Sequence, residues 1–109
     1  MSEIQMSIFD FIQPTYDTSD LEKLPEDDMV MFIRNATGIN FQYRDELFGY
    51  EATINKWQYR VKYGRYSGNN ERFIACECCD KISGWSGPQD TVDHAIEFFQ
   101  KALARNGRK

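Results

Sequence analysis

The stretch FGYEATINKWQYRVKY, residues 48–63, decides the fold of this 109-residue chain. The apolar residues of its first half stand at every second position: Phe48, Tyr50, Ala52 and Ile54. Those of its second half do the same: Trp57, Tyr59, Val61 and Tyr63. Alternation with a period of two is typical of strands that bury one face. Asn55 and Lys56 separate the halves, so the stretch predicts a hairpin with its turn there.

A third strand and a first helix are expected on either side of this hairpin. The strand covers residues 72–79 after a turn at residues 67–70, and its alternation places Ile74, Cys76 and Cys78 on one face. The helix covers residues 26–36 and ends at Gly38. Its apolar stripe consists of Met29, Val30, Ile33 and Ala36. Its start is marked by Pro25 and by three acidic residues that suit the positive end of a helix dipole: Glu26, Asp27 and Asp28.

A second helix is expected at the C-terminal end. Residues 84–88 are predicted to be a loop, and Pro88 is predicted to open the helix. Its apolar stripe consists of Val92, Ala95, Ile96, Phe99, Ala102 and Leu103. With both helices packed on one face of the sheet, the pattern predicts a two-layer α+β domain of order helix, three antiparallel strands, helix (αβββα).

The chain divides near residue 20. Residues 1–12 are apolar but too few to build a core, and residues 13–20 are polar and contain turn formers. We therefore expect residues 1–20 to form a flexible tail and residues 21–109 to form a single domain.

Composition excludes several classes of protein. The chain is 41% hydrophobic, and it contains neither an apolar run long enough for a membrane span nor a signal peptide. Its three cysteines, an odd number, fit a reducing compartment better than a disulfide scaffold. The expected location is therefore the cytoplasm.

The net charge of −4 is unevenly distributed. Residues 1–40 hold eight acidic and two basic residues, whereas residues 41–109 hold nine acidic and eleven basic residues. Four basic residues of the predicted sheet are candidate nucleic-acid contacts: Arg60, Lys62, Arg65 and Arg72. The favoured alternative is that Glu51 and Glu77 on flanking strands pair with Arg60 and Lys62 as a solvated, salt-bridged face.

The tail contains a short motif. Gln5-Met6-Ser7-Ile8-Phe9 resembles the peptide by which bacterial replication and repair proteins dock on the sliding clamp of DNA polymerase. That peptide is a glutamine, a variable apolar residue, a small polar or acidic residue, an aliphatic residue and phenylalanine. Met6 and Ile8 stand where leucine is the usual choice. The resemblance implies that Ile8 and Phe9 fill an apolar pocket while the Gln5 amide bonds backbone groups at its rim.

Two alternatives to this interpretation stay open. Gln5, Ile8 and Phe11 also fit the related motif of eukaryotic and archaeal clamps, although Ile12 replaces its second aromatic residue. Alternatively, the apolar residues of the tail pack on the domain as an extra strand or helix: Ile4, Ile8, Phe9, Phe11 and Ile12.

The predicted element order is also similar to that of the double-stranded RNA-binding domain. That family contacts phosphates with basic residues in the loop before its second helix, but residues 84–90 of this chain contain no lysine or arginine. RNA binding is therefore not predicted from the topology. An acidic first helix could instead imitate DNA and inhibit a DNA-binding enzyme, although acids at a helix start are more commonly partners of the dipole.

Metal and catalytic sites are not predicted. Cys76 and Cys78 would point into the core and Cys79 away from it, so these thiols cannot converge with His94 on a zinc ion. Asp93 and His94 are neighbours on a helix, in an orientation that does not suit catalysis. We therefore expect a non-enzymatic protein without a cofactor. It would be an accessory protein of bacterial, phage or mobile-element origin that docks on the sliding clamp, or alternatively an inhibitor or adaptor, or a weak nucleic-acid-binding module.

Overall fold

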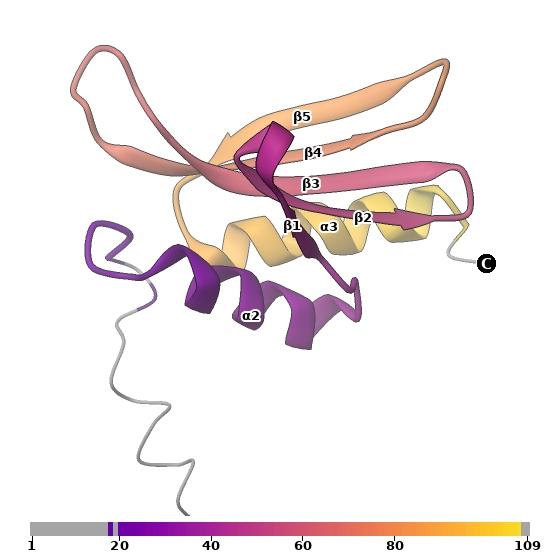
Figure 1. Cartoon of the computed structure of the whole chain (residues 1–109), viewed down its shortest axis with the longest axis horizontal. Coiled ribbons are helices and arrows are strands. Elements are labelled where there is room, and N and C mark those ends of the chain that lie inside the picture. The colour runs from indigo at the N-terminus through magenta and orange to yellow at the C-terminus, as the bar shows by residue number, and fades with distance from the viewer. Residues whose placement is uncertain (1–17, 19, 108–109) are drawn as a thin grey trace, which may run out of the picture.

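The fold is a two-layer α+β arrangement, as the sequence predicts. The computed structural model describes residue 18 and residues 20–107. Within these residues, two α-helices lie on one face of an antiparallel sheet of five strands in the order β1-β2-β3-β4-β5 (Figure 1). The elements are α2 (Glu26–Thr37), β1 (Gln42–Arg44), the 3₁₀ turn η2 (Asp45–Leu47), β2 (Gly49–Ile54), β3 (Trp57–Arg65), β4 (Arg72–Cys79), β5 (Gly84–Gln89) and α3 (Val92–Arg105).

The central strands β3 and β4 follow the predicted alternation. Tyr59 and Val61 of β3 are buried toward the helices, and Cys78 and Cys76 face them across the ladder. Asn106, at the end of α3, donates to the Tyr59 hydroxyl at 2.9 Å. The predicted hairpin turn is confirmed, with Asn55 at φ 58°. The alternation thus sets which face of the sheet the helices cover.

Both helices bury the expected faces, with one correction in α2. Met29, Val30 and Ile33 are buried, but Ala36 is exposed and Thr37 is buried in its place. The Thr37 hydroxyl donates to the Ile33 carbonyl at 2.7 Å, and the same oxygen accepts from the N–H of Ile39 at 3.2 Å. Because both hydrogen bonds are internal, this polar side chain can be buried at low cost.

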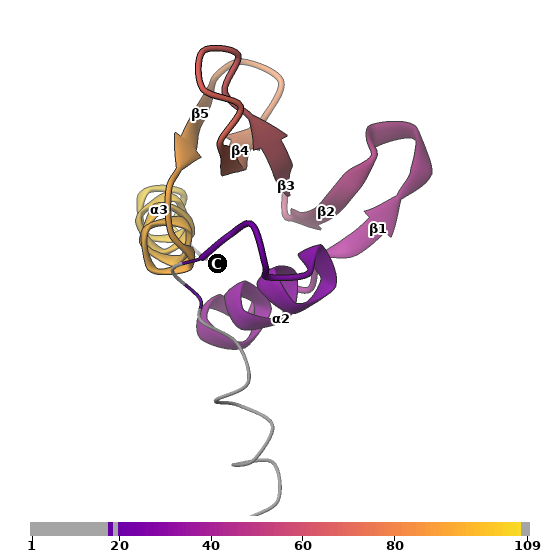
Figure 2. The ribbon, with the colours of Figure 1, turned by 90° about the vertical axis from the view of Figure 1, so that its left-hand side faces the viewer.

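The helices lie side by side under the sheet (Figure 2). Phe99 of α3 is fully buried and packs edge-on against Phe41 at a centroid distance of 5.2 Å. Phe99 also contacts the ring of Tyr59 at 6.3 Å. These rings join α3, β3 and the segment that leads from α2 into β1, so the core of the described residues is centred on Phe99.

Acidic residues at the start of α2 attach that helix to the sheet. The Glu26 carboxylate accepts from the N–H of Tyr63 at 2.9 Å, and Asp27 accepts from the Tyr50 hydroxyl. The Tyr63 hydroxyl donates to the Leu24 carbonyl at 2.7 Å. Burial of this phenol raises the pKa of Tyr63 to about 12. Two of the three acids therefore hold the layers together in addition to facing the helix dipole.

The prediction of a loop at residues 84–88 is wrong. These residues form most of β5, which pairs with β4 from Gly84↔Cys79 to Gln89↔Ile74. Pro88 lies inside this edge strand and does not open α3. Instead, Thr91 is the N-cap of α3, and its hydroxyl accepts from the N–H of His94 at 3.1 Å. A proline is tolerated in an edge strand because the outer edge needs no ladder donor there.

Tertiary contacts explain why so glycine-rich a segment becomes a strand. Trp85 of β5 stacks on Trp57 of β3 at 5.3 Å, and the Arg105 guanidinium lies over the Trp85 ring at 4.4 Å. The β4–β5 turn is closed by Asp80, whose carboxylate accepts from the N–H groups of Ile82 and Ser83, each at 2.8 Å. These hydrogen bonds lower the pKa of Asp80. A distant tryptophan and arginine thus provide what local propensity lacks.

The other edge of the sheet was also underpredicted. β1, which pairs with β2 through Tyr43↔Tyr50, has no strand in the predicted αβββα order. Phe48, expected to begin a strand, precedes β2 in the left-handed region at φ 51° and is 77% exposed. With strands added at both edges, the αβββα order is wrong, and the topological similarity to the double-stranded RNA-binding domain that rested on it is lost. None of the helices in the described part of the chain is long and apolar enough to cross a membrane.

The packing around Phe99 predicts that Phe99→Ala lowers the free energy of unfolding by about 3–5 kcal/mol, because it leaves a cavity where three elements meet. Urea denaturation followed by circular dichroism measures this change. Ile82→Ala is the matched control, since Ile82 is 91% exposed at the β4–β5 turn. The control should change stability by less than about 0.5 kcal/mol. Equal effects of the two substitutions would contradict this description of the core.

Candidate docking surface

The face of the sheet that points away from the helices carries the candidate site. The strand registers bring its side chains into cross-strand rows. One row consists of Glu51, Arg60, Glu77 and Ser86, and the next of Lys62, Ala75 and Pro88. Residues that are adjacent across a ladder are within side-chain contact distance. Four strands therefore contribute to one continuous surface.

A groove of about 470 Å³ lies on this face, and we call it the outer-face groove. Its volume is within the range of known ligand pockets, about 300–1,000 Å³. Backbone and side chains from β2 to β5 and from η2 line it: Leu47, Gly49, Tyr50, Arg60, Val61, Lys62, Phe73, Ala75, Cys76, Glu77, Ser86, Gly87 and Pro88. Small residues along the middle of the face leave the hollow open.

The walls of the groove exist because two glycines accept neighbouring side chains. A Cβ atom at Gly64 would lie 2.6 Å from Cζ of Phe73, so the aromatic ring rests on the β3 backbone. The same ring packs against Tyr66, with the two ring centroids 4.6 Å apart. A Cβ atom at Gly49 would lie 2.8 Å from Cβ of Lys62. Phe73 and Lys62, which both line the hollow, therefore depend on glycines for their positions.

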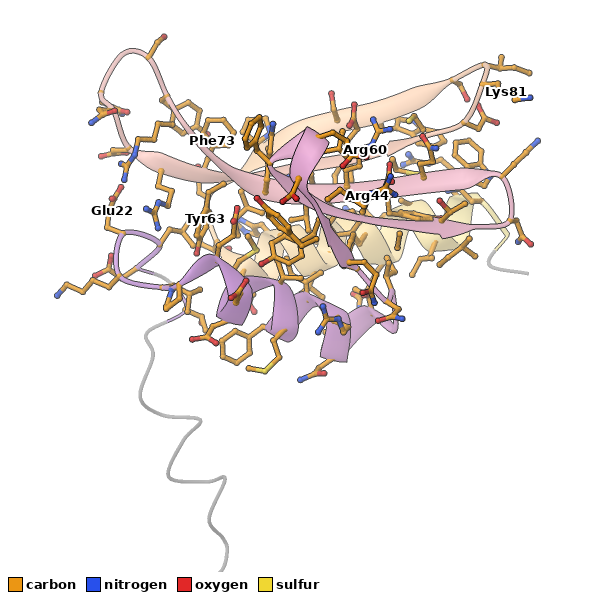
Figure 3. The ribbon with its side chains drawn as sticks, viewed as in Figure 1. Glu22, Arg44, Arg60, Tyr63, Phe73 and Lys81 are labelled. Carbon is orange, nitrogen blue, oxygen red and sulfur yellow. The ribbon has the colours of Figure 1, made fainter. Side chains whose placement is uncertain are left out.

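Arg60 lies at the middle of this face and is held by carboxylates from both neighbouring strands (Figure 3). Its guanidinium contacts Glu51 at 2.8 Å and Glu77 at 3.3 Å, and it donates to the Gln58 side chain at 3.0 Å. The hydrogen bond to Glu51 is the main reason that the pKa of Arg60 is raised. Arg44 also contacts Glu51, at 3.1 Å. The positive charge of Arg60 is therefore largely neutralised within the sheet.

Lys62 differs from Arg60, its neighbour on the same face. Its ammonium group contacts the Leu47 carbonyl at 3.5 Å, and it forms no ion pair with any carboxylate of the described residues. The expected pairing of Lys62 with Glu51 or Glu77 is wrong, since both of these carboxylates bind Arg60. Lys62 is thus a cation that lines the groove and that no carboxylate in the described part of the chain contacts.

Arg65 and Arg72 form a cross-strand pair at one end of the sheet, where the domain begins. Both Arg65 and the N–H of Arg72 bind the Glu22 carboxylate, at 3.0 Å and 2.9 Å respectively. The Arg72 side chain donates to the Leu21 carbonyl at 3.1 Å and lies over the Tyr63 ring at 4.4 Å. These contacts fasten the start of the domain to β3 and β4 (Figure 3).

The four basic residues proposed as nucleic-acid contacts therefore do not act as one patch. Arg60 and Lys62 share the outer face, whereas Arg65 and Arg72 engage the segment at Leu21 and Glu22. Sequence reasoning did not identify the groove itself. Its signal was the series of small residues in GWSGP, residues 84–88, which was interpreted as a loop. Because this segment is the strand β5, three of its residues line the groove: Ser86, Gly87 and Pro88.

Two of the three cysteines belong to the core. Cys76 and Cys78 are buried, Cys79 is only partly buried, and His94 is exposed on α3. Burial raises the pKa of the Cys76 and Cys78 thiols. Among the residues described by the structure, no group of three or more histidine, cysteine or acidic side chains is placed to hold a metal ion.

The residues of the clamp-type motif lie outside the described residues. This applies to Gln5, Met6, Ser7, Ile8 and Phe9, and also to Phe11. Comparisons with known protein families, with curated proteins and with solved structures find no match for this chain. Inferences about function therefore rest on the residues of the chain and on the surface described above.

The contacts of Glu22 predict a pH-dependent contribution to stability. Hydrogen bonds from Arg65 and then from the Arg72 backbone lower the pKa of Glu22 below its ordinary value of 4.5. Because the folded-state pKa is depressed, this stabilisation is present above pH 4.5 and is lost as the pH falls through the folded-state value. Glu22→Gln should therefore lower the melting temperature at pH 7, and the difference from the wild type should shrink below pH 4.5.

Calorimetry across this pH range measures the effect. Glu97→Gln is a suitable control, because Glu97 contacts only Lys101 at 3.7 Å in an exposed pair on α3 and should contribute little. A decrease in melting temperature for Glu22→Gln that is the same at acidic and neutral pH would contradict the assigned role of Glu22.

Proposed function

We propose that this protein is a non-enzymatic accessory factor, of bacterial, phage or mobile-element origin, that docks on the DNA polymerase sliding clamp through Gln5–Phe9. The observation that carries the proposal is the motif Gln5-Met6-Ser7-Ile8-Phe9, which fits the clamp-binding peptide at every position. An adjacent aliphatic and aromatic pair can supply most of the binding energy of such a peptide. The protein would then act near replicating DNA.

The position of the motif supports this proposal. Leu21 and Leu24 are already part of the buried core, so the motif precedes the first core residues by more than ten positions. Residues 10–20 can extend over at most about 36–40 Å. That length is sufficient for a clamp to bind the peptide without contacting the domain. A docking motif requires such a separation.

The contacts of the acidic helix weigh against the inhibitor or adaptor alternative. In that alternative the partner binds the acids of α2, but Glu26 and Asp27 accept hydrogen bonds from Tyr63 and Tyr50 of the sheet. A DNA-mimicking surface needs carboxylates that are available to a partner. The interaction of these two acids with the sheet favours the tail as the docking element.

Titration of the full chain against a bacterial sliding clamp tests the proposal. The expected dissociation constant is on the order of micromolar, because ordering a short linear peptide on its partner costs conformational entropy. Ile8→Ala and Phe9→Ala should each weaken binding by about tenfold or more, since burying such a side chain contributes ~1.5–3 kcal/mol. Ile4→Ala, one residue before the motif, is the matched control. Failure to bind, or equal affinity of all variants, would refute the proposal.

The nucleic-acid-binding alternative is tested separately. Because Arg60, Arg65 and Arg72 are engaged within the domain, we expect no measurable binding of single- or double-stranded oligonucleotides even at low salt. Fluorescence anisotropy with labelled oligonucleotides measures this. Salt-dependent binding that Arg60→Glu abolishes would instead favour the nucleic-acid-binding module.

A further inference from the structure

The described part of the domain begins at the same end of the sheet as Phe73, a lining residue of the outer-face groove. The Leu21 carbonyl accepts from the Arg72 side chain at 3.1 Å, and the Glu22 carboxylate accepts from the Arg72 backbone at 2.9 Å. Phe73, the next residue, is a wall of the groove. Tyr66, whose ring contacts that of Phe73, also lines a second hollow together with Leu21 and Glu22. Leu21 and Glu22 therefore meet Arg72 on the helix-facing side of β4, at the end of the sheet where the Phe73 side chain faces the groove on the opposite side.

The groove has a definite chemical preference. Its surface is mainly apolar, with the Phe73 ring at one side and Ala75 and Pro88 along its length. Lys62 adds a positive charge that no carboxylate of the described residues contacts. A complementary occupant is a short peptide with large apolar side chains and one acidic residue, because it would cover the apolar surface and balance this charge.

The chain itself contains such a segment. Residues 8–11 read Ile8-Phe9-Asp10-Phe11, in which three large apolar side chains surround a carboxylate. Leu21 follows Phe11 by ten positions, a length of chain that can extend over at most about 33–36 Å. Leu21 and Phe73 lie at the same end of the sheet but on opposite faces, and a chain of this length is long enough to pass around that end to the groove.

We propose that the outer-face groove binds Ile8–Phe11 of the same chain, with Asp10 facing Lys62. The groove occupancy stands independently of the clamp, but its consequence rests on the proposed function. Ile8 and Phe9 belong to the clamp-type motif, so the segment cannot occupy the groove and a clamp at the same time. The groove then acts as an internal competitor that covers the docking motif until a clamp displaces it.

The size of the effect follows from tethering. A short flexible linker provides an effective concentration of about 1 mM. If the segment binds the groove with an intrinsic dissociation constant of roughly 0.1 mM, the covered form exceeds the open form about tenfold, and the apparent clamp affinity falls by about the same factor. Emptying the groove should therefore strengthen clamp binding by about tenfold.

Amide chemical shifts of the full chain, recorded by NMR without a clamp, test groove occupancy directly. Phe11→Ala should shift the amides of groove residues such as Lys62, Ala75 and Gly87, because the segment leaves the groove. Ile4→Ala, in the tail but outside the segment, should leave these amides unchanged. Equal groove spectra for the wild type and Phe11→Ala would overturn the proposal. Shifts that disappear on dilution would also overturn it, because the segment would then come from a second copy.

A charge exchange tests the Asp10–Lys62 contact and the competition. Lys62→Glu should shift the groove amides in the same direction as Phe11→Ala and should raise clamp affinity about tenfold. The double variant Lys62→Glu with Asp10→Lys should restore the wild-type spectrum and affinity. If no variant binds a clamp but the spectra behave as stated, the proposed function fails and groove occupancy stands. If the wild type and Lys62→Glu bind a clamp equally and their groove amides coincide, the function stands and this inference fails.

Discussion

The structure depends on the strict alternation of side chains along β3. Tyr59 and Val61 point to the helices, and Arg60 and Lys62 point away from them. A slip of one residue in either neighbouring ladder would bury two cations and expose the core. The Arg60 ion pairs with Glu51 and Glu77 reinforce this register from the outer side. The same alternation that builds the core therefore also builds the outer face.

The ion pairs that stabilise the sheet determine the chemical character of its outer face. Carboxylates on both flanking strands are engaged by Arg60, which leaves Lys62 without an acidic contact among the described residues. Glycine at position 64 lets the Phe73 ring lie on the backbone and form a wall. A mainly apolar hollow with a single unbalanced charge suits an acidic, aromatic peptide better than a phosphate backbone, which requires several available cations.

The first described residues of the domain are held to the sheet by two arginines. Arg65 and Arg72, which sequence reasoning grouped with the cations of the outer face, instead bind Glu22 and Leu21. These contacts place the first described residues of the domain at the end of the sheet where Phe73 lies, on the face opposite to the Phe73 ring. In the arrangement that we propose, the tail reaches the groove although Ile8–Phe11 and Phe73 lie more than sixty residues apart in the sequence.

The sequence by itself determined the α+β class, the three central strands and the buried faces of α3 and of most of α2, because these follow from local periodicity. It also determined the clamp-type motif, which is a property of consecutive residues. Only the tertiary structure decided the edge strands. The small residues of β5 hide the alternation that would predict a strand. The strand is instead stabilised by contacts with Trp57, Arg105 and β4. The tertiary structure likewise decided the groove and the lack of an acidic contact to Lys62 among the described residues. Both depend on which side chains become neighbours across the ladders.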